Sequence, residues 1–361
     1  MLGNSNCNGR KIRLTLLIVL WLSFQANAQT STDSPSQDIT EIPVEQLFNL
    51  EVVTASKFAQ QVIDAPAAVT VVTAEDIRAY GYRTLAEILN SVRGLHTTYD
   101  RIYQYLGGRG FGRPGDYTGR IMVLIDGYAA DDNLYNQSYL GNDGILDTAL
   151  IDRVEYVPGS GSSAYGNNAY FGIINIVTKD GHQLSGGQAS VGIGSYQSKD
   201  YRITYGDSLK NGADFVLSAS GFDSNGQTLT FPEISSSAIH GLDYENNQRL
   251  FGKLHYEEVS IEGGYSRRLK AAPTAPYASD PNSRNYYEDT NGFLNIGYDR
   301  DISPELKAAA KTYVGYYTFN QNAFYSGISD RENDLGQWWG SRFKIYRNLV
   351  SGTQIGIRDR V

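Results

Sequence analysis

Tyrosine is the residue type with the clearest binding chemistry in this sequence. Two stretches on either side of Ile121–Ile125 carry aromatic and basic side chains that suit a ligand site, namely Tyr99, Tyr103, Tyr105, Arg113, Tyr117, Tyr128, Tyr135 and Tyr139. A tyrosine offers a flat stacking surface and a hydroxyl at a small cost in side-chain entropy. The chain contains 27 tyrosines, so these residues can also fill an interface between two layers of the fold. Both interpretations stay open.

Catalytic and metal-binding patterns are not found in the sequence. The four histidines, His96, His182, His240 and His255, stand far apart without metal-ligand spacing, and no serine lies in a nucleophile-elbow glycine pattern. The segment 131–133, Asp-Asp-Asn, contains oxygen ligands that calcium accepts, but we expect a solvated acidic loop there. We therefore predict neither an enzyme nor a resident cofactor or metal.

A glycine-rich stretch at 159–164 follows one predicted strand and precedes another, as in dinucleotide-binding proteins. That function needs a helix whose N-terminus points at the pyrophosphate. Residues 165–168, Tyr-Gly-Asn-Asn, are typical of a turn and leave no room for such a helix. Together with the net charge of -8, this argues against nucleotide and nucleic-acid binding.

Short strands and two helices are predicted from Leu50 to Gly181, which indicates an α+β domain. The first helix begins near Thr73 and ends near Tyr80. The second opens at Thr84 with a capping box, in which the Thr84 hydroxyl and the Glu87 carboxylate accept from backbone N–H groups, and it ends at Gly94. Two runs, 121–125 and 173–177, are apolar at every position and predict buried strands.

From Leu184 onward the pattern changes to alternating apolar and small or polar residues. The apolar positions are Val191, Ile193, Tyr201, Ile203, Tyr205, Phe215, Leu217, Ala219, Val259, Ile261, Tyr265, Leu294, Ile296, Tyr298, Tyr313, Gly315, Tyr317 and Phe319. Period two predicts about eight or nine strands with one apolar face, which fits a transmembrane antiparallel β-barrel or a soluble β-sandwich.

The N-terminus predicts export. Basic residues at 10, 11 and 13 precede the apolar run Leu14–Phe24, and Ala26-Asn27-Ala28 forms a cleavage site, so residues 1–28 are predicted to be a signal peptide. The run is too short to span a bilayer as a helix, although an uncleaved anchor is the alternative. Cys7 is the only cysteine and precedes the run, so the mature chain has no disulfide. Residues 29–49 are predicted to be a flexible periplasmic tail.

Five ordered segments carry a resemblance to a known family. They are Pro66–Ile77, Leu85–Leu95, Gly108–Phe111, Val123–Gly127 and Asp152–Lys179. In this order they resemble the plug domain of TonB-dependent outer-membrane receptors. The resemblance implies a plug domain at 50–181 and the N-terminal part of an outer-membrane β-barrel at 184–361. Such transporters close with 22 strands, so the barrel is expected to be incomplete, as in a fragment or a truncated gene product.

The resemblance also implies roles for particular residues. Leu50-Glu51-Val52-Val53-Thr54-Ala55 resembles the TonB box, which adds a strand to the TonB energy-coupling protein; the alternative is that Val52 and Val53 form the first plug strand. Arg109 matches an arginine that acts as a latch between plug and barrel, although Pro158 replaces the usual second arginine, and a solvated turn residue is the alternative. The tyrosine loops listed above would contact the ligand.

The implied function is energy-coupled uptake of a scarce ligand such as a ferric siderophore or cobalamin. The implied partners are TonB, a small-molecule ligand such as a metal chelate, and outer-membrane lipid. Two alternatives remain open at this point, a passive porin or adhesin barrel and, from another class, a secreted β-rich hydrolase. Fold does not fix the ligand.

Overall fold

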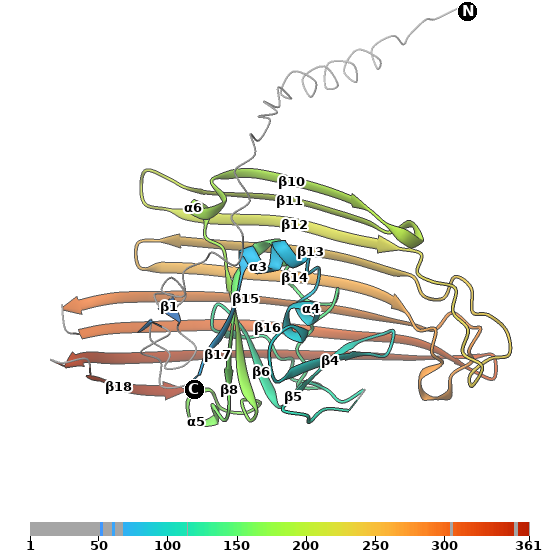
Figure 1. Cartoon of the computed structure of the whole chain (residues 1–361). Coiled ribbons are helices and arrows are strands. Elements are labelled where there is room, and N and C mark those ends of the chain that lie inside the picture. Colours follow the sequence, from blue (N-terminus) through green and yellow to red (C-terminus); the bar gives the residue numbers. More distant parts are fainter. Residues whose placement is uncertain are drawn as a thin grey trace, which may run out of the picture. The chain divides into compact units, whose positions relative to one another are not determined.

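The computed structural model describes residues 51–52, 60–61, 68–113, 115–303, 306–349 and 353–360. All of them belong to one compact unit, Glu51–Val361. Within these residues the chain forms two main sheets, a mixed sheet of five strands in the order β3-β8-β9-β6-β7 and a sequential sheet of nine strands, β10 to β18 (Figure 1). No described helix is both long and apolar enough to cross a membrane.

The first helix, α3 (Ala74–Tyr80), confirms the prediction and begins with a capping box that the sequence analysis did not identify. The Thr73 hydroxyl accepts from the Asp76 N–H (3.2 Å), and the Asp76 carboxylate accepts from the Thr73 N–H (2.9 Å). At the other end Gly81 takes a left-handed conformation with φ 67°, which glycine adopts without a Cβ penalty. Capping at both ends stabilises a helix of only seven residues.

The second helix, α4 (Leu85–Asn90), begins after the predicted N-cap Thr84 but differs from the prediction in the partner of Glu87 and in its C-terminal end. The Thr84 hydroxyl accepts from the Glu87 N–H (3.3 Å), but the Glu87 carboxylate accepts from the Arg83 N–H (2.7 Å), so the reciprocal half of the capping box involves Arg83 instead of Thr84. The predicted end at Gly94 is wrong, because the Ser91 hydroxyl donates to the Ile88 carbonyl (2.7 Å) and closes the helix earlier. Gly94, with φ 90°, instead serves the turn into β4.

The five-stranded sheet contains the predicted buried strands. Strands β6 (Ile121–Ile125) and β9 (Gly172–Thr178) pair in parallel, and all five residues of β6 are buried, which confirms the prediction that both faces are covered. The other members are β3 (Thr70–Thr73), β8 (Ile151–Pro158) and β7 (Tyr128–Ala129), each in antiparallel pairing. A hairpin of β4 (Leu95–Tyr99) and β5 (Gln104–Gly108) lies outside this sheet.

Three short helical elements lie in the connections between strands β7 and β10. Helix α5 (Ser162–Tyr165) begins in the glycine-rich stretch and ends at the first residue of the predicted turn 165–168, so no dinucleotide-binding helix follows the stretch, as predicted. It has four residues and no side-chain cap at Gly161, which is too little for a dinucleotide-binding helix. Helix α6 (Gly181–Leu184) leads into the long sheet, and the 3-10 turn η3 (Thr148–Leu150) precedes β8.

The nine-stranded sheet is antiparallel throughout. Its strands are β10 (Gly186–Ile193), β11 (Lys199–Ser208), β12 (Asp214–Ser224), β13 (Glu245–Tyr256), β14 (Val259–Ala271), β15 (Tyr286–Ser303), β16 (Leu306–Tyr325), β17 (Ile328–Leu349) and β18 (Thr353–Arg360). Connections alternate between the two ends of such a sheet. We call the end with the connections 194–198, 225–244, 272–285 and 326–327 the loop end, because it carries the two longest ones.

The two faces of the long sheet have opposite chemistry. One face exposes apolar side chains such as Val191 (82%), Ile193 (86%) and Trp339 (74%). The other buries polar side chains, among them Thr204, Ser218, Asn247, Arg249, Glu262, Ser266, Arg268, Asp289 and Asn291. The N-terminal elements lie against this polar face, where they bond to it. A soluble sandwich buries its apolar faces between two sheets, so the exposed apolar face excludes that alternative.

The predicted alternation is wrong for one strand, β16. Tyr317 and Phe319 were expected on the apolar outer face, but both are buried against the N-terminal elements. The outer face of β16 instead carries Val314, which is half exposed. The reason is that Tyr317 donates to Asp289 (2.8 Å) and Phe319 packs against Tyr135. Period two alone cannot tell which of two mixed faces turns inward.

Candidate ligand site

The structure brings four of the predicted tyrosines to one cavity of about 670 Å³. These are Tyr103, Tyr105, Tyr117 and Tyr135, all from the N-terminal part. Of the others, Tyr99 lines a second cavity, whereas Tyr128 and Tyr139 are buried in the interface with the long sheet. Arg113 is exposed and lines neither cavity. The contact of these residues with a ligand stays a prediction.

The opposite wall of this tyrosine cavity comes from the loop end of the long sheet. It contributes Pro276, Tyr277, Tyr287, Tyr317, Phe319, Gln321, Tyr325, Asp330 and Glu332. The two walls interlock through aromatic contacts, since the Tyr103 ring lies edge-on to Tyr287 with centroids 6.1 Å apart, and Tyr135 lies edge-on to Phe319 at 5.8 Å. Strands β15, β16 and β17 have 18, 20 and 22 residues, about twice the number that a bilayer requires. These strands therefore extend beyond the bilayer, and the cavity lies on the part that extends beyond it.

Carboxylates hold the tyrosine rings in place from behind. Tyr103 and Tyr317 both donate to Asp289, at 2.9 and 2.8 Å. Tyr105 donates to Asp100 (2.8 Å), whose carboxylate also accepts from two backbone N–H groups. Burial raises the pKa of the Tyr105 hydroxyl, and the nearby Asp100 carboxylate raises it further, so this group stays a neutral donor. The rings are therefore fixed before any ligand arrives.

A buried ion cluster lies directly behind the tyrosine cavity. Arg268 of β14 is 4% exposed and contacts three carboxylates, Glu245 (2.7 Å), Asp143 (3.7 Å) and Asp289 (3.9 Å). Its guanidinium also donates to the Ile102 carbonyl (2.5 Å) and lies 5.7 Å from the centroid of the Tyr103 ring. Since Asp143 and Ile102 come from the N-terminal part, one cation ties that part to β13, β14 and β15.

A second link joins the N-terminal part to the loop end. Arg101 forms an ion pair with Asp243, which lies in the connection 225–244, and Asp243 also accepts from Lys270 of β14 (2.6 Å). Lys270 is fully buried. These bonds thus link the connection 225–244 to the turn that precedes Tyr103 and β5.

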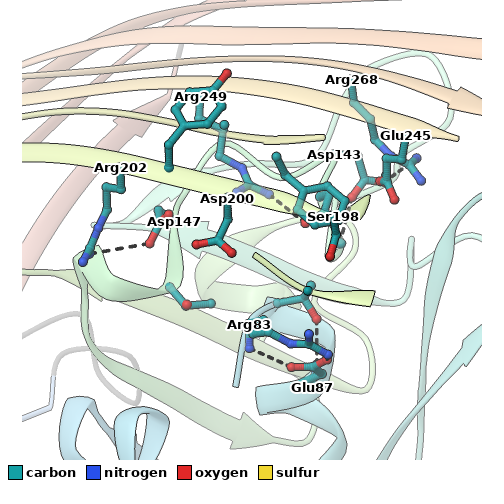
Figure 2. Close-up of a pocket in the computed structure, with 18 of the residues that line it drawn as sticks. Arg83, Glu87, Asp143, Asp147, Ser198, Asp200, Arg202, Glu245, Arg249 and Arg268 are labelled. Carbon is teal, nitrogen blue, oxygen red and sulfur yellow. Dashed lines mark hydrogen bonds and ion pairs between the residues drawn. The ribbon is translucent and has the colours of Figure 1, made fainter. Parts of the chain in front are cut away.

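The second cavity, of about 520 Å³, contains charges of both signs (Figure 2). It lies between the N-terminal part and strands β10 to β14 and is lined by Arg83, Glu87, Asp143, Asp147, Asp200, Arg202, Glu245, Arg249 and Arg268, among others. Its arginines all have partners. Arg202 pairs with Asp147 (3.8 Å), Arg83 pairs with Glu87 (3.7 Å), and Arg249 donates to the Gly144 carbonyl (2.8 Å).

The segment 131–133 was expected to be a solvated acidic loop, and this is wrong for Asp132. Asp132 is buried and accepts from the N–H groups of Leu134 (2.7 Å), Tyr135 (2.6 Å) and Gln137 (3.1 Å). These bonds shape the loop that presents Tyr135. In the described residues, no group of three or more histidine, cysteine or acidic side chains is placed to hold a metal ion.

Asp131 gives the N-terminal part a pH-dependent stability. Burial raises the pKa of its carboxyl to about 6 from the usual 3.8, against the effect of hydrogen bonds from Ser138 and Asn168. The folded state therefore binds this proton more tightly than the unfolded state. Its contribution, roughly 2 to 3 kcal/mol, is fully present below the unfolded pKa and is lost as the pH rises through about 6.

We predict that Asp131→Asn removes this dependence. The midpoint temperature of unfolding of the wild type should fall between about pH 4 and about pH 7 by more than that of the variant. Asp116→Asn, at a surface ion pair with Arg120, serves as the control and should behave as wild type. A fall in Asp131→Asn that is as large as the fall in the wild type assigns the titration to another group.

Two predicted sites remain, the Arg109 latch and the TonB box, and the structure describes only part of the second. Arg109 is exposed at the turn after β5, with φ 56°, and among the described residues no carboxylate pairs with it. Its role as a latch stays a prediction. In the predicted TonB box, Glu51–Val52 forms β1 and pairs with Gln60–Gln61 (β2), apart from the five-stranded sheet. Leu50, Val53, Thr54 and Ala55 lie outside the described residues.

Sequence reasoning missed the residues that the long sheet contributes. They are Arg268, Asp289, Glu245, Tyr287 and Tyr317. A usable indication was present, because charged residues at inward positions of a membrane strand are costly unless paired. Arg268 and Asp289 are such positions. The indication identifies a buried polar contact but not the partner in the N-terminal part, Ile102 or Tyr103, which lies more than 100 residues away.

Comparison with known proteins gives consistent matches. Residues 61–173 match the family model described as TonB-dependent Receptor Plug Domain. The chain is 30% identical over 314 residues to the vitamin B12 transporter BtuB of Vibrio cholerae serotype O1, which covers 81% of this chain and 48% of that protein. It is 28% identical over 273 residues to an iron-regulated outer membrane virulence protein of the same species, covering 70% of this chain and 37% of that protein.

Solved structures share the fold at lower identity. The ferric yersiniabactin uptake receptor FyuA from Yersinia pestis has a TM-score of 0.60 and 15% identity, over 81% of this chain and 48% of that one. The ferric citrate transporter FecA, in its unliganded form, has a TM-score of 0.61 and 16% identity, over 83% and 47%. The chain spans about half the length of the vitamin B12 transporter that it matches.

Proposed function

This chain is the plug domain and the first part of the β-barrel of a TonB-dependent outer-membrane receptor, and from this premise we propose that the receptor takes up a scarce ligand with energy from the inner membrane. The ligand class is that of ferric siderophores, cobalamin or similar molecules. The relatives named above include transporters of vitamin B12 and of ferric citrate. Ligand binds in the tyrosine cavity between the plug and the loop end of the barrel.

The observation that carries this proposal is the buried ion cluster around Arg268 between plug and barrel. A passive porin or an adhesin needs no folded domain held inside the barrel by paired charges. A plug held by paired, buried charges is stable at rest but releases when one partner is displaced, because an unpaired buried charge costs several kcal/mol. That behaviour suits a gate that opens only under force. A hydrolase is disfavoured, because the charged groups of the second cavity are largely paired with one another and Asp100 of the tyrosine cavity accepts from Tyr105.

The force is proposed to act through the TonB box, Leu50–Ala55. An extended segment with Val52 and Val53 can add a strand to the edge of a TonB sheet, where the backbone supplies the hydrogen bonds. In the structure Glu51–Val52 already pairs as a strand with Gln60–Gln61. We propose that TonB replaces β2 as the partner of this strand and then pulls on the plug.

The remaining assignments complete the proposal. Residues 1–28 act as a cleaved signal peptide, 29–49 as a periplasmic tail, 50–181 as the plug and 184–361 as part of a barrel embedded in outer-membrane lipid. The exposed apolar face of the long sheet supports contact with lipid. Arg109 is proposed to latch onto carboxylates of barrel strands that follow β18, since it is exposed at a turn of the plug.

Energy dependence tests the proposal in cells that carry the full-length gene and lack their own receptors. Uptake of radiolabelled cyanocobalamin or ferric citrate should occur with one of the two, and a protonophore should stop it while surface binding persists. Uptake that continues at an undiminished rate in the presence of the protonophore would identify a passive pore and refute the proposal.

A further inference from the structure

One aspartate ties the connection 272–285 to the tip of the neighbouring hairpin. The Asp280 carboxylate accepts hydrogen bonds from the N–H groups of Ser326 (3.0 Å) and Gly327 (2.7 Å), the two residues of the turn between β16 and β17. The Asp280 N–H donates to the Phe324 carbonyl (2.7 Å). Three hydrogen bonds of a single residue therefore join two of the connections at the loop end.

Asn285 strengthens this tie from the end of the same connection. Its side-chain oxygen accepts from the Phe324 N–H (2.9 Å), and its side-chain amide donates to the Asp280 carbonyl (2.8 Å). The Asn285 side chain is buried, and it bonds to both partners at once. The connection and the hairpin tip thus share one hydrogen-bond network.

The backbone just before Asp280 is strained. Ala275, Tyr277 and Ala278 have φ angles of 46°, 54° and 62°, in the left-handed region that residues other than glycine avoid. Ala275 also precedes Pro276, and a proline favours an extended conformation at the residue before it. Strained backbone persists only where the surrounding structure holds it in place. The hydrogen bonds of Asp280 supply that constraint, two residues after the strained segment.

The strained segment carries a tyrosine that a ligand can reach. Tyr277 lines the tyrosine cavity opposite Tyr105 and Tyr117 of the N-terminal part, and it is 79% exposed. Packing does little to fix so exposed a ring, so the backbone of residues 275–278 decides where it lies. An exposed tyrosine ring offers a ligand a face for stacking.

We infer that Asp280 is a ligand-positioning residue, which holds the segment 275–278 to the turn between β16 and β17 and thereby keeps Tyr277 at the tyrosine cavity. A ligand then meets a ring that is already in place, and binding does not have to order the connection first. This inference rests on the proposed function, because it concerns the same ligand site. It adds the residue that prepares one wall of that site.

Hydrogen exchange of the purified full-length receptor without ligand tests whether Asp280 fixes the connection. Asp280→Ala should make the backbone N–H groups of 276–285 and 324–327 exchange at least about tenfold faster, because the bonds that join the two segments are lost. Asp280→Asn keeps one acceptor oxygen and should show a smaller increase. Asp301→Ala is the matched control, since it removes a carboxylate paired with Lys307 (3.1 Å) at the opposite end of β15, and both segments should exchange as in the wild type.

Binding of cyanocobalamin and of ferric citrate to the same receptors tests whether Asp280 acts through Tyr277. Asp280→Ala and Tyr277→Ala should each weaken the probe that the wild type binds by about fivefold, as expected for one lost stacking contact. In the double variant the two losses should not multiply, because the second change removes nothing that the first has left in place. A residue that only stabilises the fold would give losses that multiply.

Unchanged exchange of 276–285 in Asp280→Ala, wild-type affinity in either single variant, or losses that multiply in the double variant overturns the inference. Failure of the importer is distinguishable, since exchange and binding are measured without an energy source. Uptake that is insensitive to the protonophore would refute the importer and leave these exchange and binding results as they are.

Discussion

Val53→Pro in the full-length receptor is expected to reduce uptake by roughly 10- to 100-fold while ligand binding is unchanged. Proline removes a backbone N–H and restricts the residue to conformations that disturb strand pairing. Each backbone hydrogen bond lost from an added strand costs about 1 to 3 kcal/mol, which gives that range of affinity for TonB. Initial rates of energy-dependent uptake and equilibrium binding to whole cells are the two measurements.

Val53→Thr is the matched control for this change. Threonine keeps the β-branched shape and the backbone N–H, so the strand can still form and uptake should stay within about twofold of wild type. If Val53→Pro lowers ligand binding as much as uptake, the segment belongs to the folded plug instead of to a TonB contact. The short strand β1, formed by Glu51–Val52, is the structural reason to take that outcome seriously.

Arg268→Met is expected to loosen the plug from the barrel by about 3 to 5 kcal/mol. The variant keeps an unbranched apolar side chain but removes the guanidinium, which leaves Glu245, Asp143 and Asp289 facing one another without that cation. Near-ultraviolet circular dichroism of the detergent-solubilised receptor should show a lower midpoint temperature. Cells with the variant should become sensitive to a large antibiotic that the closed plug excludes.

Arg267→Met is a sharp control because it changes the neighbouring residue on the opposite face of β14. Arg267 is 38% exposed and pairs only with Glu288 (2.5 Å), so its loss should cost less than about 1 kcal/mol. Arg268→Lys should give an intermediate result, since lysine keeps the charge but lacks the planar fork that reaches several acceptors. Equal stability of Arg268→Met and Arg267→Met contradicts a role for the cluster in holding the plug.

The substitutions Val53→Pro and Arg268→Met test two different steps of the proposed transport mechanism. The proposed TonB box, residues 50–55, comes at the N-terminal end of the plug sequence, and the Arg268 cluster lies behind the tyrosine cavity. If force on the TonB box must break the Arg268 cluster, Val53→Pro prevents the plug from opening, whereas Arg268→Met lets the plug open without force. A receptor with both changes should therefore be leaky, since the plug no longer needs to be pulled.

The sequence alone determined the local elements of this protein. Helix α3, the buried strands β6 and β9 and the alternation of the long strands follow from capping residues and from hydrophobic period, both of which act between near neighbours. Predictions from local sequence were wrong where one residue suits two structural roles. Gly94 suits a helix cap and a turn equally well, and only the early closure by Ser91 assigned it to the turn.

The tertiary structure alone decided the contacts that make the site. Tyr287 and Tyr103 are separated by more than 180 residues, and so are Tyr103 and Asp289. Each looks ordinary in its own strand or loop. Which loop residue a strand's inner face meets depends on the position of the whole plug against the sheet, and nothing in a period-two pattern encodes that position. A period-two pattern also allows either face of a strand to turn inward. The bond from the Tyr317 hydroxyl to Asp289 places the aromatic face of β16 inside, because a buried hydroxyl needs a hydrogen-bond partner.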